Sequence, residues 1–257
     1  MTATRFATER SEAIVIVKAA PQIGAKSGEI VCCAGVDANK NWVRLFPVSF
    51  RQLDKQRKFN RWDKISYSWR KPKDDKRIES RRVDHESIEI VGSLPRKEHS
   101  KFLSSLIVTS VDKEYSEGRT LALLKPEIID FFYIKKSEED IREEVTRFEI
   151  AQQQQDLFAE NTIKRYQACP YTFKYRYLTS DGLREGTCQD WEIPTTYLKW
   201  SKLYGEAETL EKMVHIFGKD YPRKGLVFAM GTHSQYPGTW LINGVIRLDS
   251  QDQLDLL

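Results

Sequence analysis

Short apolar runs in the first hundred residues have the spacing of β-strands. They are four to eight residues long, alternate or are β-branched, and are separated by Gly, Pro, Asn and Asp. Residues 63–69 alternate strictly, so that Ile65, Tyr67 and Trp69 share one face. The pattern predicts strands that form a small β-barrel or curved sheet, at residues 13–17, 29–36, 42–48, 63–69 and 87–91.

The middle of the chain changes to a mixed pattern. Pro95 begins a predicted helix that ends near Leu106, and two strands follow at 121–124 and 128–134. Ser137 precedes a run of acidic residues, which indicates the N-terminus of a helix. This helical segment is predicted to join two β-rich lobes.

The last third predicts more strands and two helices. Residues 171–177 alternate strictly, and Asp181-Gly182 indicates a turn that brings 187–193 back as a hairpin partner. Helices are predicted from Pro194 and over 206–217, and strands over 226–230 and 240–248.

Strands and helices without a regular βαβ rhythm indicate the α+β class. The predicted domains are a β-barrel lobe over 1–137, a helix or linker over 138–165, and an α+β lobe over 166–257.

Composition excludes several classes. In 257 residues no apolar run approaches the roughly 18 that a membrane helix needs, and the N-terminus lacks the layout of a signal peptide. We expect a cytoplasmic protein without membrane contact. The four cysteines form no CxxC pair, so we expect buried thiols and no metal site.

Charge is concentrated in one stretch. Residues 51–82 hold thirteen Lys or Arg and five acids, a net +8, whereas the whole chain carries +4. Such asymmetry is typical of proteins that bind a polyanion, and it predicts DNA or RNA as the partner. The alternative is a solvated loop.

Aromatic residues are spaced among these charges, as in sites where bases stack beside a positive groove. Tyr67 and Trp69 share a face with Ile65, which favours a core position for them. The candidate nucleic-acid-binding residues are Trp42, Arg44, Arg51, Arg57, Lys58, Arg61, Trp62, Lys64 and Arg70. For Trp42 and Arg44 the alternative is a barrel plug and an ordinary surface charge.

Three residues are candidates for catalysis. On a strand, Asp190 and Glu192 would project from one face, where two carboxylates could hold a magnesium ion for phosphodiester hydrolysis. His233, in the polar loop 231–238, could act as an acid or base. The alternatives are a cap or salt bridge for the carboxylates and simple exposure for the imidazole.

The stretch CCAGVDANKNWVRL, within Val31–Leu45, carries a family resemblance. It resembles the opening of uncharacterised prokaryotic proteins with OB-like barrels of the dual-OB type, often carried near defence or mobile elements. The resemblance implies an OB-like first lobe that binds nucleic acid on one face, and a context in phage defense or mobile-element biology.

Three functions remain open at this point. The first is a nucleic-acid-binding recognition or accessory module without a cofactor. The second is an enzyme acting on nucleic acid, either a nuclease using magnesium or a base-processing hydrolase such as a DNA glycosylase. The third is an interaction protein whose basic loop meets an acidic partner. The sequence lacks Walker, GxGxxG, HExxH and GxSxG motifs, which disfavours ATP-driven and zinc-protease chemistry.

Overall fold

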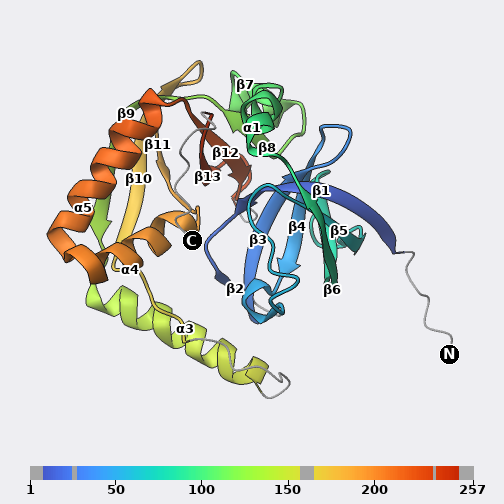
Figure 1. The fold of residues 1–257 in the computed structure, drawn as a ribbon, viewed down its shortest axis with the longest axis horizontal. Helices are drawn as coiled ribbons and strands as arrows, with labels where there is room; N and C mark the ends of the chain where they lie inside the picture. Colours follow the sequence, from blue (N-terminus) through green and yellow to red (C-terminus); the bar gives the residue numbers. More distant parts are fainter. Residues whose placement is uncertain (1–7, 25–27, 157–164, 234–235, 249–257) are drawn as a thin grey trace.

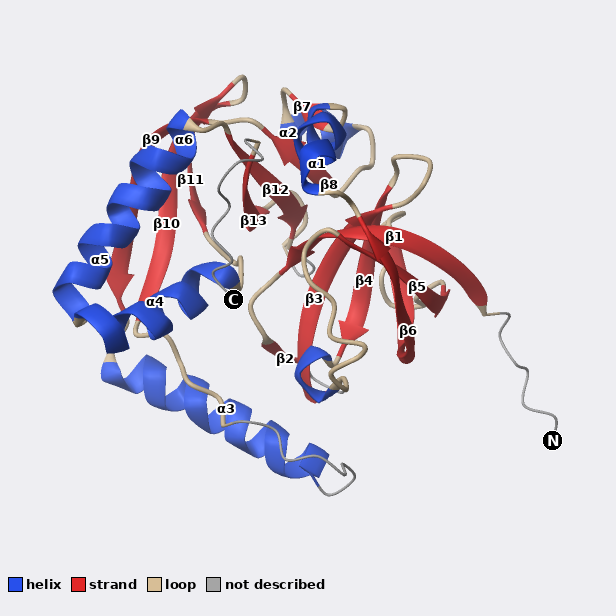
Figure 2. Ribbon diagram, in the orientation of Figure 1, coloured by secondary structure: helices blue, strands red, loops and turns tan. Residues whose placement is uncertain are grey.

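The computed structural model describes residues 8–24, 28–156, 165–233 and 236–248. Figure 1 shows two β-rich lobes side by side, and Figure 2 shows strands in both with most helices around the second. The predicted α+β class is confirmed. No helix in these ranges is both long and apolar enough to cross a membrane.

The first lobe is a β-barrel. Its described strands close in the order β1-β3-β4-β6-β5-β1, and β4 and β6 are the parallel neighbours in a ring that is otherwise antiparallel. Five strands with the third and fifth parallel form the Greek-key barrel of the OB-fold. The bounds are β1 Glu9–Lys18, β3 Gly28–Val36, β4 Trp42–Val48, β5 Asp63–Arg70 and β6 Ser80–Ser93, with β2 Gln22–Gly24 beside β3 and a 3₁₀ turn, η1, at Phe50–Gln52.

Alternation of inward and outward side chains along the strands explains which residues fill the barrel. Val43 and Leu45 point into its interior, and Phe46 points out and is 41% exposed. Tyr67 is fully buried in the same interior, as its alternation with Ile65 predicts. Gly35 lies where β3 crosses β1, and a Cβ there would sit 2.6 Å from the carbonyl oxygen of Ile14. Only glycine permits this close approach.

The second lobe packs two sheets against each other. One has the order β11-β10-β9 and the other β13-β12-β8-β7. Their inner faces meet at aromatic contacts such as Tyr175 with Phe228. The strands are β7 Ile107–Val108, β8 Leu121–Leu124, β9 Glu127–Lys135, β10 Tyr171–Thr179, β11 Gly182–Thr187, β12 Leu226–Thr232 and β13 Trp240–Arg247.

Helices surround these sheets, with α5 along the outer side of the second lobe and α3 beneath both lobes (Figure 1). Ser137 caps α3 as predicted, because its hydroxyl accepts a hydrogen bond from the Asp140 amide at 3.0 Å. The helices are α1 Arg96–Ser104, α2 Val111–Ser116, α3 Glu138–Asp156, α4 Glu192–Tyr204, α5 Glu206–His215, the π-helical turn η2 Ile216–Asp220 and α6 Tyr221–Arg223.

One local prediction was wrong. Residues 187–193 do not form one hairpin strand, because β11 ends at Thr187 and α4 begins at Glu192. The strand predicted over 87–91 is confirmed, and it is part of the longer β6, which begins at Ser80. β8 and β9, at residues 121–135, pair with strands beyond residue 170, whereas the predicted lobe boundary lies at 137. That boundary stays a prediction, and residues 157–164 of the predicted linker lie outside the described ranges.

The lobes share a buried interface. Val17 of the barrel and Leu123, Val227 and Ile246 of the second lobe belong to one apolar cluster. Ala19, just after β1, bridges to Asp190, just before α4. The outer face of β1 and part of that of β4 are therefore covered by the second lobe.

Candidate functional site

Part of the basic segment, by which we mean residues 51–82, lies inside the molecule. Arg61 is 8% exposed, and its Nη2 donates to Asp190 Oδ2 at 2.9 Å and lies 3.1 Å from Glu192 Oε1. Its Nη1 donates to the carbonyl oxygen of Val245 at 3.1 Å. Burial acts to lower the pKa of Arg61, but the carboxylates of Glu192 and Asp190 outweigh it and raise that pKa. Arg61 is thus a fixed cation that joins the barrel to the second lobe.

Lys18 lies beside this ion pair. It is 7% exposed, and its Nζ donates to the carbonyl oxygen of Phe59 at 3.3 Å and lies 4.8 Å from the centre of the Phe50 ring. Burial lowers the pKa of the Lys18 ammonium, since a charge is costly away from water. Lys18 therefore belongs to the interface and not to an exposed cationic surface.

A second set of polar contacts crosses the same interface. Arg44 is 3% exposed, and its Nη2 donates to the carbonyl oxygen of Thr120 at 3.1 Å. The Glu79 carboxylate accepts from the amide of Thr120 at 2.6 Å and from its hydroxyl at 2.9 Å. Arg44 is therefore not the ordinary surface charge that was one predicted alternative. It is also not available to a nucleic acid in this structure, which was the other.

Trp42 and the tryptophans of the segment also take structural positions. Trp62 is 8% exposed and stacks on His99, with ring centres 3.8 Å apart. Trp42 is half-buried against the inter-lobe cluster, and so it does not plug the barrel. Trp69 packs against the barrel core, where its Nε1 donates to Ser11 Oγ at 2.9 Å. Stacking of bases on Trp42 or Trp62 would require these contacts to open.

Two arginines of the segment, together with Phe46 of β4, form an exposed row across three strands. Phe46 on β4 pairs with Arg82 on β6, and Arg82 pairs with Arg70 on β5. Paired residues in neighbouring strands point to the same face, so the three side chains lie next to each other on the outside of the barrel. All three are exposed. We call Phe46, Arg82 and Arg70 the outer row.

The loop between β5 and β6 extends this surface. It carries exposed lysines at positions 71, 73 and 76. Its shape is held from within, because Asp75 accepts from Arg77 Nε at 2.8 Å and from Ser80 Oγ at 2.7 Å. Burial acts to raise the pKa of Asp75, but these hydrogen bonds outweigh it and lower the pKa to about 2. Arg77 Nη1 also donates to the carbonyl oxygen of Thr232 at 3.0 Å and ties the loop to the second lobe.

The remaining predicted cations fall into two groups. Lys58 is exposed. The other three are paired with acids: Arg51 with Glu29 at 2.7 Å, Arg57 with Asp54 at 3.4 Å, and Lys64 with Glu12 at 2.6 Å. Of the nine predicted nucleic-acid-binding residues, the structure places only Arg70 in the outer row.

The two predicted catalytic carboxylates converge on Arg61 and not on an open site. Asp190 is 1% exposed, and its Oδ2 also accepts from the Val245 amide at 2.7 Å, while its Oδ1 accepts from the Glu192 amide at 3.0 Å. A guanidinium therefore occupies the position where a metal would bind. Within the described ranges, no three His, Cys, Asp or Glu side chains are grouped as a metal site requires.

His233 lies just past the end of β12. Its amide donates to the carbonyl oxygen of Thr239 at 2.9 Å, and its Nδ1 accepts from the Tyr236 amide at 3.2 Å. These contacts hold the imidazole within its own loop, of which residues 234–235 lie outside the described ranges. The catalytic roles of all three residues stay predictions.

Phe46, Arg82 and the loop lysines were not among the site residues predicted from the sequence. Phe46 alternates with the buried Val43-x-Leu45 pattern, and this signal could have placed it on the outer face of the barrel. The pairing of Arg82 with Phe46 could not be read from the sequence, because it depends on the parallel register of β4 and β6.

Two family models match the chain. One, described as "Domain of unknown function (DUF8758)", matches residues 9–108, and the other, described as "Domain of unknown function (DUF8757)", matches residues 104–256. None of the curated proteins matches the chain.

One similar solved structure is described as "Crystal structure of the tetrameric p202 HIN2". It is 8% identical, the match covers 92% of this chain and 89% of that one, and the TM-score is 0.33. The OB assignment of the first lobe rests on the strand pairing given above. Because the second family model covers more than half of the sequence, the chain belongs to the family described as Domain of unknown function (DUF8757).

Proposed function

We propose that this protein binds nucleic acid on the outside of its barrel, through the outer row and the basic loop between β5 and β6. The observation that supports it is the position of these residues in the OB topology. OB-folds bind oligonucleotides on the face of their second and third strands and with the loop between their fourth and fifth. Phe46 lies on the third strand, and Lys71, Lys73 and Lys76 lie in that loop.

The chemistry of the surface fits a single strand better than a duplex. An exposed ring beside two guanidinium groups offers a stacking platform next to phosphate-binding cations. The second lobe covers Arg44 and the neighbouring part of this face, so the accessible part is narrow. A narrow platform accommodates an unpaired strand with its bases turned inward. DNA and RNA share this chemistry.

The test is a fluorescence-anisotropy titration with single-stranded and duplex DNA and RNA at several salt concentrations. We expect wild-type protein to bind single strands, with an affinity that falls as salt rises. The double variant Arg70→Ala/Arg82→Ala should bind at least about tenfold more weakly, since two charge-assisted contacts are lost. Arg223→Ala, an exposed arginine of α6, is the matched control and should bind like wild type.

Equal affinity of the double variant and the control would contradict the proposal. Weak binding by all three proteins at low salt would contradict it as well, and would favour the protein-partner alternative. A recognition or accessory role in phage defense is the finer prediction, and a plaque assay with cells that express wild-type or double-variant protein would test it.

A further inference from the structure

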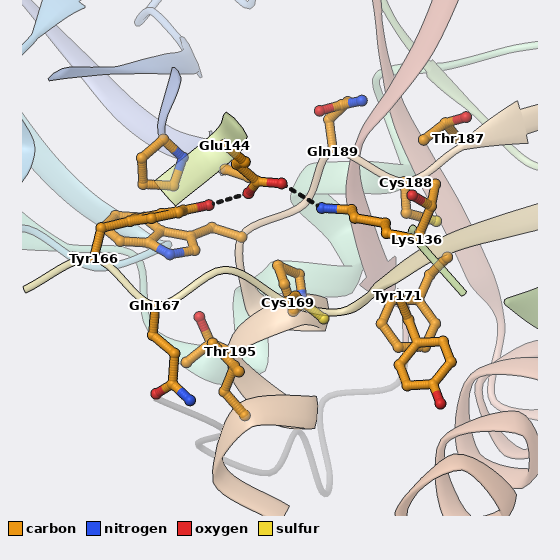
Figure 3. Close-up of a pocket in the computed structure, with 17 residues that line it drawn as sticks. Lys136, Glu144, Tyr166, Gln167, Cys169, Tyr171, Thr187, Cys188, Gln189 and Thr195 are labelled. Carbon is orange, nitrogen blue, oxygen red and sulfur yellow. Dashed lines mark hydrogen bonds and ion pairs between the residues drawn. The ribbon is translucent and has the colours of Figure 1, made fainter. Parts of the chain in front are cut away.

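A cavity of about 250 Å³ lies apart from the outer row, at the junction of the lobes. Its wall combines Ala20 and Pro21, from the connection after β1, with residues of the second lobe. Figure 3 shows the polar side chains that surround it. None of Phe46, Arg70 and Arg82 belongs to its lining.

One wall of the cavity is a rigidly held aromatic ring. The ring of Tyr166 stacks on Phe148, with centres 3.6 Å apart and an angle of 5° between the planes. Its hydroxyl donates to Glu144, which also pairs with Lys136 Nζ at 2.7 Å (Figure 3). Because Phe148 covers one face, the cavity meets the other face or the edge of the ring. Burial and the neighbouring carboxylate raise the pKa of Tyr166, so the hydroxyl stays protonated.

Other polar side chains of the wall have no hydrogen-bond partner among the described residues. These are the amide of Gln189 and the hydroxyls of Thr172, Thr187 and Thr195. An amide both donates and accepts, as does a hydroxyl. The wall therefore offers both kinds of hydrogen-bonding group to a ligand.

The cavity does not select an anion. The charges of Lys136 and Glu144 cancel each other. The first amides of α4 are already occupied, because the Glu192 amide donates to Asp190 Oδ1 and the Thr195 amide to the carbonyl oxygen of Trp191. The helix N-terminus thus offers little to a phosphate, and a neutral ligand fits better.

We propose that this cavity binds one nucleobase, packed against the ring of Tyr166 and hydrogen-bonded by Gln189 and Thr195. A base is planar and neutral, and it carries both donors and acceptors on its edge, as the wall requires. The volume lies below the roughly 300–1,000 Å³ of sites for drug-sized ligands, so it suits one ring system. The base could belong to a free nucleoside or to a nucleic-acid strand. The inference does not depend on the outer row.

Calorimetric titration with adenosine, guanosine, cytidine and uridine tests this, with ribose and glucose as controls. We expect saturable binding of at least one nucleoside and none of either sugar. Gln189→Leu keeps the size of the side chain and removes the amide, so it should weaken that binding by roughly tenfold, the effect of one or two hydrogen bonds. Thr195→Val is a second variant with an effect in the same direction. Leu203→Ala, on the exposed side of α4, should bind like wild type.

No heat of binding from any nucleoside up to ~10 mM, the limit of weak specific binding, would overturn the proposal. Binding of a sugar as tight as that of a nucleoside would overturn the choice of ligand. Unchanged binding by both folded variants, judged by their melting temperatures, would overturn the choice of site.

A competition experiment distinguishes the two sources of the base. The nucleoside that binds is added to the complex with a labelled oligonucleotide, in wild type and in Arg70→Ala/Arg82→Ala. Displacement of the oligonucleotide assigns the cavity to a base of the strand, and binding without displacement assigns it to a free nucleoside. Failure of oligonucleotide binding alone would count against the outer row and leave the nucleobase cavity standing.

Discussion

The basic segment 51–82 has two parts with opposite environments. Arg61 is buried between two carboxylates and joins the lobes, whereas Arg82, on the same barrel, is exposed beside Phe46. Both count equally in the net charge of the sequence. The difference is that one guanidinium has acidic and carbonyl partners from residues more than a hundred positions away, and the other faces water. A local excess of positive charge therefore overstates the size of a binding surface.

The largest expected effect comes from the buried part. Arg61→Ala leaves Asp190 buried without its cation, and we expect the free energy of unfolding to fall by about 3–5 kcal/mol. Urea denaturation followed by circular dichroism measures this. A double variant with Asp190→Asn should recover part of the loss, because the unpaired charge is then gone. A loss below about 0.5 kcal/mol, the range of an ordinary surface substitution, would contradict the structural role.

Phe46 should show the reverse of Arg61: its substitution should change the affinity for nucleic acid and leave the stability nearly unchanged. Phe46→Ala removes the stacking platform, and we expect the affinity for a single strand to fall by about 1–3 kcal/mol. Anisotropy measures the affinity, and the melting temperature should change little because the ring is 41% exposed. Leu183→Ala removes an apolar side chain that is 64% exposed on the second lobe and serves as the control. Equal affinities of the two variants would remove Phe46 from the interface.

Asp75 tests how the basic loop is held. Its pKa of about 2 lies below its ordinary 3.8, so its ionised form stabilises the fold above pH 4, and this contribution is lost as the pH falls toward 2. Asp75→Asn should lower the free energy of unfolding by about 1–2 kcal/mol at pH 7 and by much less near pH 2. Denaturation at several pH values measures the difference. Asp74→Asn, at the exposed neighbouring position, should match wild type throughout.

The loop lysines should give the smallest effects. Lys71→Ala should weaken binding similarly for all base sequences and reduce the slope of log K against log salt by about one. The same titration series with Lys219→Ala, an exposed lysine of η2 on the second lobe, gives the reference slope. An unchanged slope for Lys71→Ala would show that the loop does not contact phosphates.

The sequence predicted the strands better than the site. Alternation placed Tyr67 in the barrel and predicted 171–177 as a strand, which lies within β10, because one face of each strand is buried. The Asp190–Glu192 pair shows the limit of this approach. They were predicted to share one face of a strand, yet α4 begins at Glu192. The two carboxylates still meet on Arg61, and the Arg61–Asp190 contact joins residues 129 positions apart. Such long-range contacts decide which charges are buried, and no local pattern contains them.

Photocrosslinking can locate a bound single strand on the surface of the protein. A bromouracil-substituted single strand is irradiated in complex with the protein, and the modified peptides are identified by mass spectrometry. We expect crosslinks to Phe46 and to the loop at residues 71–76. In Phe46→Ala the crosslink at position 46 should be lost. Crosslinks confined to the second lobe, or to Trp42 and Trp62, would contradict the proposed binding surface.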